Sequence, residues 1–202
     1  MATFSVILPT ISRPSLSRSI ASVIDQLEHD DELIVVGDGR QDGAADVVES
    51  FQPANLLYVE AEQKGSRFGN AQRTFAMQLA LGRSSHLLFI DDDDVYVHGA
   101  LDVVRQALDN ADVPNAAHIF KATWGNGHHA QGVTLWDTPE VRAGNIGSPM
   151  CVLPNRPYAR SWFYCNDHGR NGITSDFGFL SAAIGECGGV EWHDSLVAIV
   201  RP

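Results

Sequence analysis

The sequence predicts an α/β fold in which a mainly parallel sheet is flanked by helices. In the N-terminal half, short apolar runs of strand length alternate with segments whose apolar residues have helical spacing. Strands separated by helices of this length form βαβ units, whose strands lie parallel. The chain has 202 residues, 44% hydrophobic and 19% charged, which suits one globular domain with a sizeable core. We therefore expect a single domain over residues 1–202.

The first predicted strand covers Phe4 to Leu8 and stops at Pro9. After it, apolar residues at helical spacing between Leu16 and Leu27 predict a helix. A second buried strand is predicted over Leu33 to Val36, and it ends in Gly37-Asp38-Gly39, a sequence typical of turns. Both strands therefore end in residues that favour a turn or loop.

Two further strands complete the predicted parallel sheet. A short helix over Ala44 to Phe51 leads to a third strand at Leu56 to Val59. A longer helix over Ala71 to Leu81 leads to the fourth strand, Leu87 to Ile90, which is a continuous apolar run. A last helix of this half is predicted around residues 101–108.

The second half of the domain, about residues 111–202, is predicted to be smaller and irregular, because glycine and proline recur through it. Its predicted elements are short: strands at 118–123, 131–136, 151–153 and 196–200, and a helix at 176–184. No repeat or low-complexity linker separates this half from the first, about residues 1–110.

Four consecutive aspartates, Asp91 to Asp94, follow directly on the fourth predicted strand. Four like charges repel one another and no packed core needs them at a strand end, whereas carboxylate oxygens suit a hard divalent cation. The alternative is a solvated acidic turn that caps the next helix, although one cap needs one aspartate. In parallel sheets the ligand lies at the carboxyl ends of the strands, so we expect Asp38 to share a site with this cluster.

Composition excludes several classes of partner. The net charge of −11 argues against nucleic acid or an anionic membrane surface as a general partner. The three cysteines are odd in number and widely spaced, which indicates reduced thiols rather than a disulfide framework. The chain shows no signal-like opening segment and no apolar run of membrane-spanning length. These features predict a cytoplasmic protein.

Three segments resemble motifs of glycosyltransferase family 2 and occur in that family's order. They are Ser5 to Thr10 with Arg13-Pro14, then Val35 to Gly43, and then Asp91 to Asp94 with the residues up to Leu101. The resemblance implies a Rossmann-like GT-A fold and a glycosyltransferase that uses a nucleotide diphosphate sugar, with Mn²⁺ or Mg²⁺ as cofactor. We expect a UDP-linked donor, an acceptor hydroxyl and an inverting transfer. The Gln-x-x-Arg-Trp signature of processive synthases is absent, which favours a non-processive enzyme.

The resemblance also implies roles for single residues. Asp38 matches the acid that contacts the nucleotide base, Asp91 the first acid of the DxD motif, and Asp93 the principal metal ligand, which Asp91 assists. The residues implied to contact the nucleotide sugar are Pro9, Thr10, Arg13, Asp38, Arg73, Asp91 and Asp92. Gly37 departs from the family motif, where an acid is usual. Arg73 lies in a loosely matched segment, and an ordinary surface arginine is the alternative for it.

An inverting transfer needs a carboxylate that accepts the proton of the acceptor hydroxyl. In the family this base lies near the start of a late helix, and Asp176 matches that position. An ordinary helix-start acid is the alternative for Asp176, and Asp167 is the competing base. Some GT-A enzymes recruit a late histidine as a metal ligand, which makes His193 a candidate ligand; a half-buried structural histidine is the alternative.

Two other functions remain open from the sequence. A sugar nucleotidyltransferase has a similar fold, but it needs a glycine-rich loop after its first strand, and Pro9 to Pro14 contains no glycine. A non-catalytic domain that binds a nucleotide sugar, or that uses the aspartates for Ca²⁺, is the second alternative. The sequence identifies neither the sugar, nor the acceptor, nor the oligomeric state.

Overall fold

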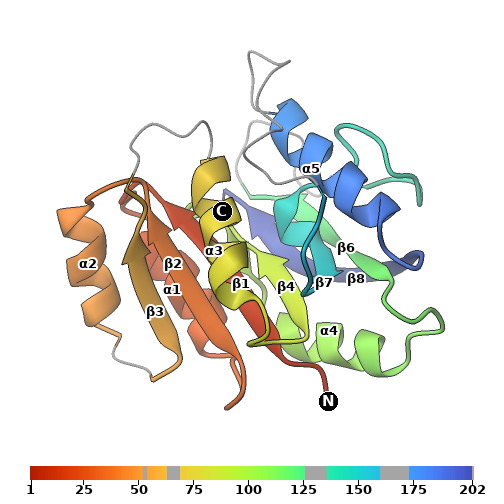
Figure 1. The fold of residues 1–202 in the computed structure, drawn as a ribbon, viewed down its shortest axis with the longest axis horizontal. Helices are drawn as coiled ribbons and strands as arrows, with labels where there is room; N and C mark the ends of the chain where they lie inside the picture. Colours follow the sequence, from red (N-terminus) through yellow and green to blue (C-terminus); the bar gives the residue numbers. More distant parts are fainter. Residues whose placement is uncertain (52–53, 63–68, 126–135, 160–172, 202) are drawn as a thin grey trace.

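The protein folds around one eight-stranded sheet with the strand order β3-β2-β1-β4-β7-β6-β8-β5 (Figure 1). The structure is a computed structural model that describes residues 1–51, 54–62, 69–125, 136–159 and 173–201. Both predicted halves contribute strands to the same sheet. The predicted α/β class is therefore confirmed.

The first four strands in spatial order form the predicted parallel part of the sheet. They are β1 (Phe4–Thr10), β2 (Glu32–Gly37), β3 (Leu56–Glu60) and β4 (His86–Phe89). β1 lies between β2 and β4, β3 pairs with β2, and all three pairings are parallel. Every residue of β1 and β2 is buried. Such strands read as continuous apolar runs because helices cover both of their faces, which is why the sequence predicts them well.

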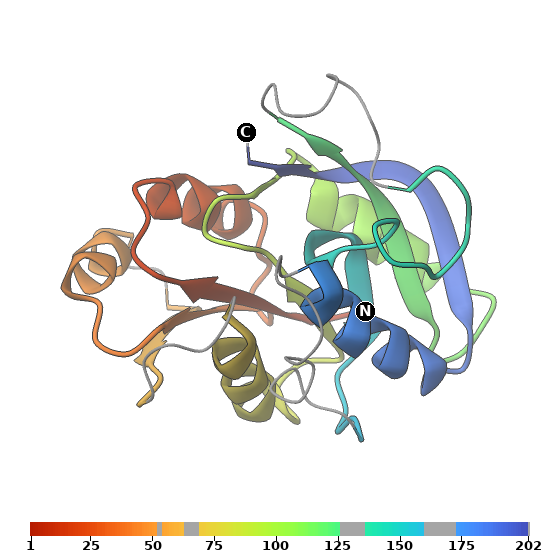
Figure 2. The ribbon, with the colours of Figure 1, turned by 90° about the horizontal axis from the view of Figure 1, so that it is seen from above.

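Helices cover the two faces of this sheet. They are α1 (Leu16–Ile24), α2 (Asp42–Glu49), α3 (Asn70–Ala80), α4 (Ala100–Asp109) and α5 (Ile173–Gly185). Seen from above, α1 and α4 lie on one side of the sheet and α3 and α5 on the other (Figure 2). On α1, Leu16, Ile20 and Val23 are buried, so the helical spacing seen in the sequence marks the face that packs on the core.

The other four strands have mixed directions, and all of them except β5 come from the second half. They are β5 (Val95–Tyr96), β6 (Ala117–Trp124), β7 (Cys151–Pro154) and β8 (Val190–Val200), with a short 3₁₀ helix, η2 (Ser148–Met150), before β7. β7 runs antiparallel to β4 and β6, whereas β6 and β8 are parallel. The sequence misses β5, which has only two residues, and the first part of β8, where polar residues interrupt the apolar pattern. The predicted strand at 131–136 lies almost entirely outside the described residues.

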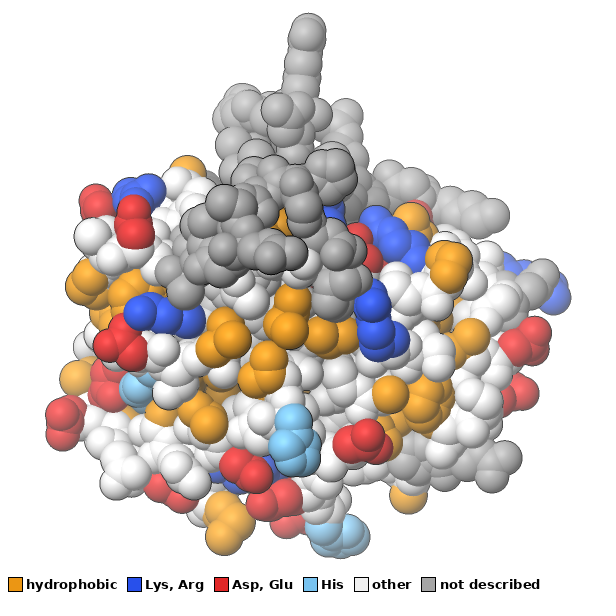
Figure 3. Space-filling view, turned by 180° about the vertical axis from the view of Figure 1, so that it is seen from behind, with side chains coloured by type: hydrophobic (Ala, Val, Ile, Leu, Met, Phe, Trp, Pro, Cys, Tyr) orange, Lys and Arg blue, Asp and Glu red, His pale blue; other side chains and the backbone are white. Residues whose placement is uncertain are grey.

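The surface carries both hydrophobic and charged side chains. From behind, hydrophobic side chains gather across the middle of the molecule, with acidic side chains along its lower rim (Figure 3). Within the described part of the chain, no helix combines the length and the apolar character that a membrane span requires. Of the cysteines in these residues, Cys151 is buried, Cys187 is partly buried, and both are free thiols.

A buried ion pair joins α4 to the edge of the core next to β1. The Arg105 guanidinium contacts the Asp31 carboxylate, with side-chain exposures of 7% and 1%. Asp31 also accepts hydrogen bonds from the backbone N–H groups of Phe4 and Glu28, both at 2.8 Å. The guanidinium lies 4.7 Å from the centre of the Phe4 ring. Removing one partner of such a pair leaves a buried charge without compensation.

We predict that Arg105→Met lowers the free energy of unfolding by about 3–5 kcal/mol, because methionine keeps the packing but leaves Asp31 without its cation. The matched control is Arg142→Met, which breaks a pair with Asp137 whose two side chains are 43% and 70% exposed. Solvent screens such a pair, so the control should show no measurable change. Urea unfolding of both variants provides the comparison, and equal losses would contradict the assigned role of Arg105.

Candidate functional site

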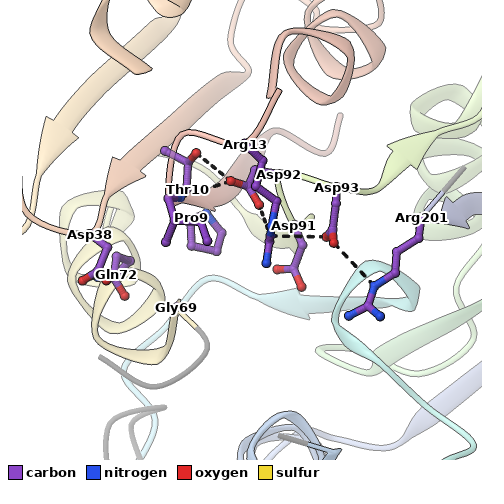
Figure 4. A pocket seen from close by; sticks show the side chains of 11 residues that line it. Pro9, Thr10, Arg13, Asp38, Gly69, Gln72, Asp91, Asp92, Asp93 and Arg201 are labelled. Carbon is purple, nitrogen blue, oxygen red and sulfur yellow. Dashed lines mark hydrogen bonds and ion pairs between the residues drawn. The ribbon is translucent and has the colours of Figure 1, made fainter. Parts of the chain in front are cut away.

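A pocket of about 350 Å³ opens at the carboxyl ends of β1, β2 and β4 (Figure 4). The first strand end contributes Pro9, Thr10 and Arg13, and the second contributes Asp38. The fourth contributes the aspartates from Asp91 to Asp93. Parallel strands bring their carboxyl ends to one edge of the sheet, which is why these distant segments meet. The expectation that Asp38 and the aspartate run share one site is confirmed.

The four aspartates differ in how deeply their side chains are buried. Asp92 and Asp94 are buried, whereas the side chains of Asp91 and Asp93 are 33% and 23% exposed and face the pocket. The interpretation that the fold itself has no need for aspartates at this strand end is therefore wrong for half of the run. Asp91 to Asp94 form a turn, in which the Asp94 N–H donates a hydrogen bond to the Asp91 carbonyl at 3.1 Å, and within this turn the two buried aspartates have structural partners.

Asp92 fixes the loop that follows β1. Its Oδ2 accepts hydrogen bonds from the Thr10 hydroxyl at 2.8 Å and from the Ile11 N–H at 3.1 Å. Its Oδ1 forms an ion pair with Arg13, and its backbone carbonyl accepts a hydrogen bond from the Ser15 hydroxyl at 2.7 Å. Asp92 lines the pocket as the sequence predicts. Through these contacts it also holds Thr10 and Arg13, two other predicted contact residues, in place.

Asp94 is buried in the same region. Its Oδ1 accepts a hydrogen bond from the Arg201 N–H at 3.0 Å, and its backbone carbonyl accepts one from the Ser19 hydroxyl at 2.6 Å. Burial, followed by the nearby charge of Asp91, raises the pKa of Asp94 to about 8. Near neutral pH and without a cation, this carboxyl group is therefore mostly protonated.

Arginines neutralise the two aspartates that face the pocket. Asp91 forms an ion pair with Arg73, and Asp93 lies 3.5 Å from Arg13 and 3.4 Å from Arg201. Burial raises the pKa of Asp93 even though Arg13 and Arg201 act to lower it. The carboxylate oxygens of Asp91, Asp93 and Asp94 lie within 4.8 Å of one another, an arrangement that a hard cation can join.

Arg73 is completely buried on α3, so the alternative of a surface arginine is wrong. Burial opposes its positive charge, but Asp91 and then Asp176 favour it, and the pKa of Arg73 is raised. Burial of a cation between two acids is possible because the acids compensate its lost hydration. No local sequence pattern shows this, because the two acids come from distant elements.

Asp176, the predicted base, lies in the first turn of α5. Burial raises its pKa to about 6; Arg73 lowers it, Asp91 raises it further, and a hydrogen bond from Ser148 lowers it. Among the described residues, the pocket lining does not include Asp176, and Arg73 connects it electrostatically with Asp91. The competing base, Asp167, lies outside the described residues.

Four residues of the pocket lining were not predicted: Ile11, Gly69, Gln72 and Arg201. Gln72 donates a hydrogen bond from its Nε2 to Oδ1 of Asp38 at 2.6 Å, which orients the carboxylate (Figure 4). Gly69 has a φ of +75°, and a Cβ there would lie 2.9 Å from the Cβ of Pro9, so a glycine is needed at the start of α3. Arg201 follows the end of β8 and lies in no motif that would predict it. Gly69 is the N-cap residue of α3, and a glycine shortly before a predicted helix is a signal that sequence reasoning can use.

The structure separates His193 from the aspartates. Its Nε2 lies 3.0 Å from Nδ1 of His118, and its ring stacks on Phe120 at a centroid distance of 4.5 Å. It groups with His118 and Glu191 instead of with Asp91, Asp93 and Asp94. β8 reaches the aspartates only at its far end, where Arg201 and not His193 contacts Asp93. The expectation that His193 joins this metal site is therefore wrong.

Comparisons with known proteins agree with this geometry. The model of the family described as glycosyl transferase family 2 matches residues 5–166. In a comparison with curated proteins, no sequence matches. Similar solved structures include S. aureus TarS 1-349, with 22% identity and a TM-score of 0.73, covering 98% of this chain and 60% of that one. The complex of TarS 1-349 with UDP-GlcNAc has 20% identity and a TM-score of 0.74, covering 98% and 58%.

The structure of S. aureus TarS has 20% identity and a TM-score of 0.75, and covers 99% of this chain but 37% of that one. The chain thus spans about three fifths of the TarS 1-349 structure and a smaller part of the longer one. These likenesses establish the fold, and the family match covers most of the chain. The protein therefore belongs to glycosyl transferase family 2 and has the GT-A fold that its strand-end motifs imply.

Proposed function

We propose that the chain is a metal-dependent, inverting and non-processive glycosyltransferase that transfers a sugar from a UDP-linked donor to an acceptor hydroxyl. The observation that carries this proposal is the meeting of Asp38 with Asp91 and Asp93 in one pocket at the carboxyl ends of neighbouring parallel strands. Membership of glycosyl transferase family 2 supports the reaction class. The TarS structures with UDP-GlcNAc and with UDP support the uridine nucleotide.

The residues of the pocket fit a divalent cation. Asp91, Asp93 and Asp94 offer carboxylate oxygens within 4.8 Å of one another, and these are the ligands that Mn²⁺ and Mg²⁺ prefer. Burial raises the pKa of Asp93 and of Asp94, so a positive ion would relieve the cost of ionising them together. When bound, such an ion stabilises the negative charge that develops on the leaving diphosphate.

Arg13 and Arg201 are suited to bind the diphosphate of the donor. Both pair with Asp93 at the pocket, and their side chains are 41% and 68% exposed. Arg13 also pairs with Asp92, which would keep it at the pocket while its contact with Asp93 opens. A guanidinium binds phosphate oxygens through paired N–H donors. We therefore infer that the two arginines exchange Asp93 for the diphosphate when the donor enters, which frees Asp93 for the cation.

Asp38 is suited to read the nucleotide base. Gln72 holds one of its oxygens, and the carboxylate lines the same pocket as the aspartates. A carboxylate accepts hydrogen bonds only, so it favours a base with a ring N–H donor, such as uracil. Pro9 and Thr10 form the neighbouring wall, and Gly69 keeps the start of α3 close to Pro9.

We propose Asp176 as the general base of the transfer. A carboxyl group with a pKa of about 6 is largely ionised at neutral pH and yet accepts a proton more readily than an ordinary aspartate. The buried cation of Arg73 favours its ionised form. Asp167 remains the alternative base.

A non-catalytic domain that binds a nucleotide sugar is the second candidate. It is favoured by one observation: among the described residues, Asp176 is not part of the pocket lining. Release of UDP from a panel of UDP-sugars, with and without Mn²⁺, separates the two functions. An enzyme of this family releases UDP by transfer to an acceptor or slowly to water, whereas a binding domain only retains the donor.

We predict that Asp93→Ala weakens Mn²⁺-dependent binding of UDP at least about tenfold, because a charged ligand to the metal is lost. Isothermal titration of UDP with Mn²⁺ and with a chelator gives the affinity. The control is Asp109→Ala, an exposed acid at the end of α4, which should bind as the unaltered protein does. Unchanged metal-dependent binding in Asp93→Ala would refute the assignment of this ligand.

A second prediction follows from the raised pKa of Asp94. A folded-state pKa of about 8 lies above the ordinary value of 3.8, so folding takes up a proton and stability falls as pH rises from about 4 to about 8. In chelator, Asp94→Asn should therefore be more stable than the unaltered protein at pH 8, by at least about 1 kcal/mol. Urea unfolding should show this gain shrinking towards pH 4, and a gain that is independent of pH would contradict the explanation.

For the base, we predict that Asp176→Asn keeps donor affinity but slows UDP release in the presence of acceptor at least about a hundredfold, because asparagine cannot accept the proton. The unaltered enzyme should lose activity as the pH falls below about 6, where Asp176 becomes protonated. A pH–rate profile of both proteins measures this. Near-normal turnover in Asp176→Asn would move the role to Asp167.

A further inference from the structure

A second cluster of metal-type ligands lies where β6 and β8 run side by side. His118 on β6 is the register partner of Glu191 on β8, and His193 follows two positions after Glu191. Alternate residues of a strand point to the same face of a sheet, so Glu191 and His193 share a face. The contact between His118 and His193 puts all three on that face.

The three side chains converge on one point. Nδ1 of His118 lies 3.0 Å from Nε2 of His193 and 4.0 Å from Oε2 of Glu191, and the three ligand atoms all lie within 4.8 Å of one another. Ligand atoms around a tetrahedral zinc ion are roughly 3.3 Å apart, given bonds of about 2.0–2.1 Å. The observed separations of 3.0 and 4.0 Å lie on either side of this value, and the His118 and His193 rings, now at an interplanar angle of 9°, would have to turn relative to each other to direct both nitrogens at one ion.

The neighbouring residues hold these ligands in place. Oε1 of Glu191 accepts a hydrogen bond from the Val113 N–H at 2.8 Å, which leaves Oε2 turned towards His118. The His193 ring stacks on Phe120 with an interplanar angle of 18°. Contacts of this kind orient metal ligands in advance. His118 is 2% exposed, whereas Glu191 and His193 are partly exposed, so an ion can enter from solvent.

We propose that His118, Glu191 and His193 form a second metal site, for a transition-metal ion such as Zn²⁺, separate from the aspartate pocket. Two imidazole nitrogens and one carboxylate suit zinc and its neighbours rather than Mg²⁺ or Ca²⁺, which prefer oxygen ligands alone. The ion would join β6 to β8. Since β8 ends at Val200 and Arg201 follows it directly, the site would also brace the strand that brings this arginine to the aspartate pocket.

The protonation state of the histidines is compatible with metal binding. Burial lowers the pKa of His118 to about 4, and burial also lowers that of His193, so both rings are neutral at neutral pH. In the metal-free protein one of the two facing nitrogens carries the hydrogen that joins them. Metal binding needs both nitrogens bare, so this proton moves to the other nitrogen of the same ring.

The test uses metal-free protein carrying Asp93→Ala, so that the aspartate pocket is weakened and does not dominate metal binding. Isothermal titration with Zn²⁺ should show one site per chain, and Co²⁺ in its place should give the visible absorption of a four-coordinate ion. His193→Phe keeps an aromatic ring against Phe120 but offers no nitrogen, and Glu191→Gln removes the charge. Each should weaken Zn²⁺ binding at least about tenfold.

The matched control is His98→Ala, which removes an exposed histidine from another part of the chain and should leave Zn²⁺ affinity unchanged. Thermal unfolding of each variant without metal shows whether it is folded before titration. The proposal is overturned if the parent protein shows no saturable Zn²⁺ binding, if His193→Phe and Glu191→Gln bind as the parent does, or if His98→Ala causes an equal loss.

Discussion

The pocket depends on the contacts of Asp92, a buried carboxylate that ties the loop after β1 to the end of β4. It accepts hydrogen bonds from Thr10 and from the Ile11 N–H, and it pairs with Arg13. This arrangement fixes one wall of the pocket. Asp92 also belongs to the turn from Asp91 to Asp94, in which the side chains of Asp91 and Asp93 stay partly exposed to the pocket. A single buried carboxylate thereby holds the loop after β1 against the aspartate turn, and both of these segments line the candidate donor site.

Balance of charge is the second constraint. The chain carries a net charge of −11, and four of its acids are consecutive in sequence, yet the cluster is compact because arginines from three distant segments meet it. Arg73 is buried and fixed, whereas Arg13 and Arg201 are partly exposed at the opening. The fixed cation belongs to the permanent structure of the site. The two exposed cations are suited to exchange one negative partner for another, which is the property a diphosphate site needs.

The sequence predicts the parallel strands and the strand-end site well, because both depend on local signals. Buried parallel strands are continuous apolar runs, as in β1 and β2, and their ends are marked by Asp38 and by the aspartate run. Burial of Arg73 could not be predicted, because it depends on two acids that are distant in sequence, Asp91 after β4 and Asp176 on α5. Arg201 and the grouping of His193 with His118 depend on how β8 pairs with β6, a long-range register with an irregularity that no sequence pattern marks.

A crystal structure of the protein with UDP and Mn²⁺, with anomalous scattering recorded at the manganese edge, tests the central claim most directly. The claim predicts a manganese peak at Asp93 and the diphosphate, with Asp38 at the uracil, and the ion pairs from Asp93 to Arg13 and Arg201 opened. UDP bound in the pocket with no manganese at Asp93, and with both arginines still paired to that carboxylate, would contradict it.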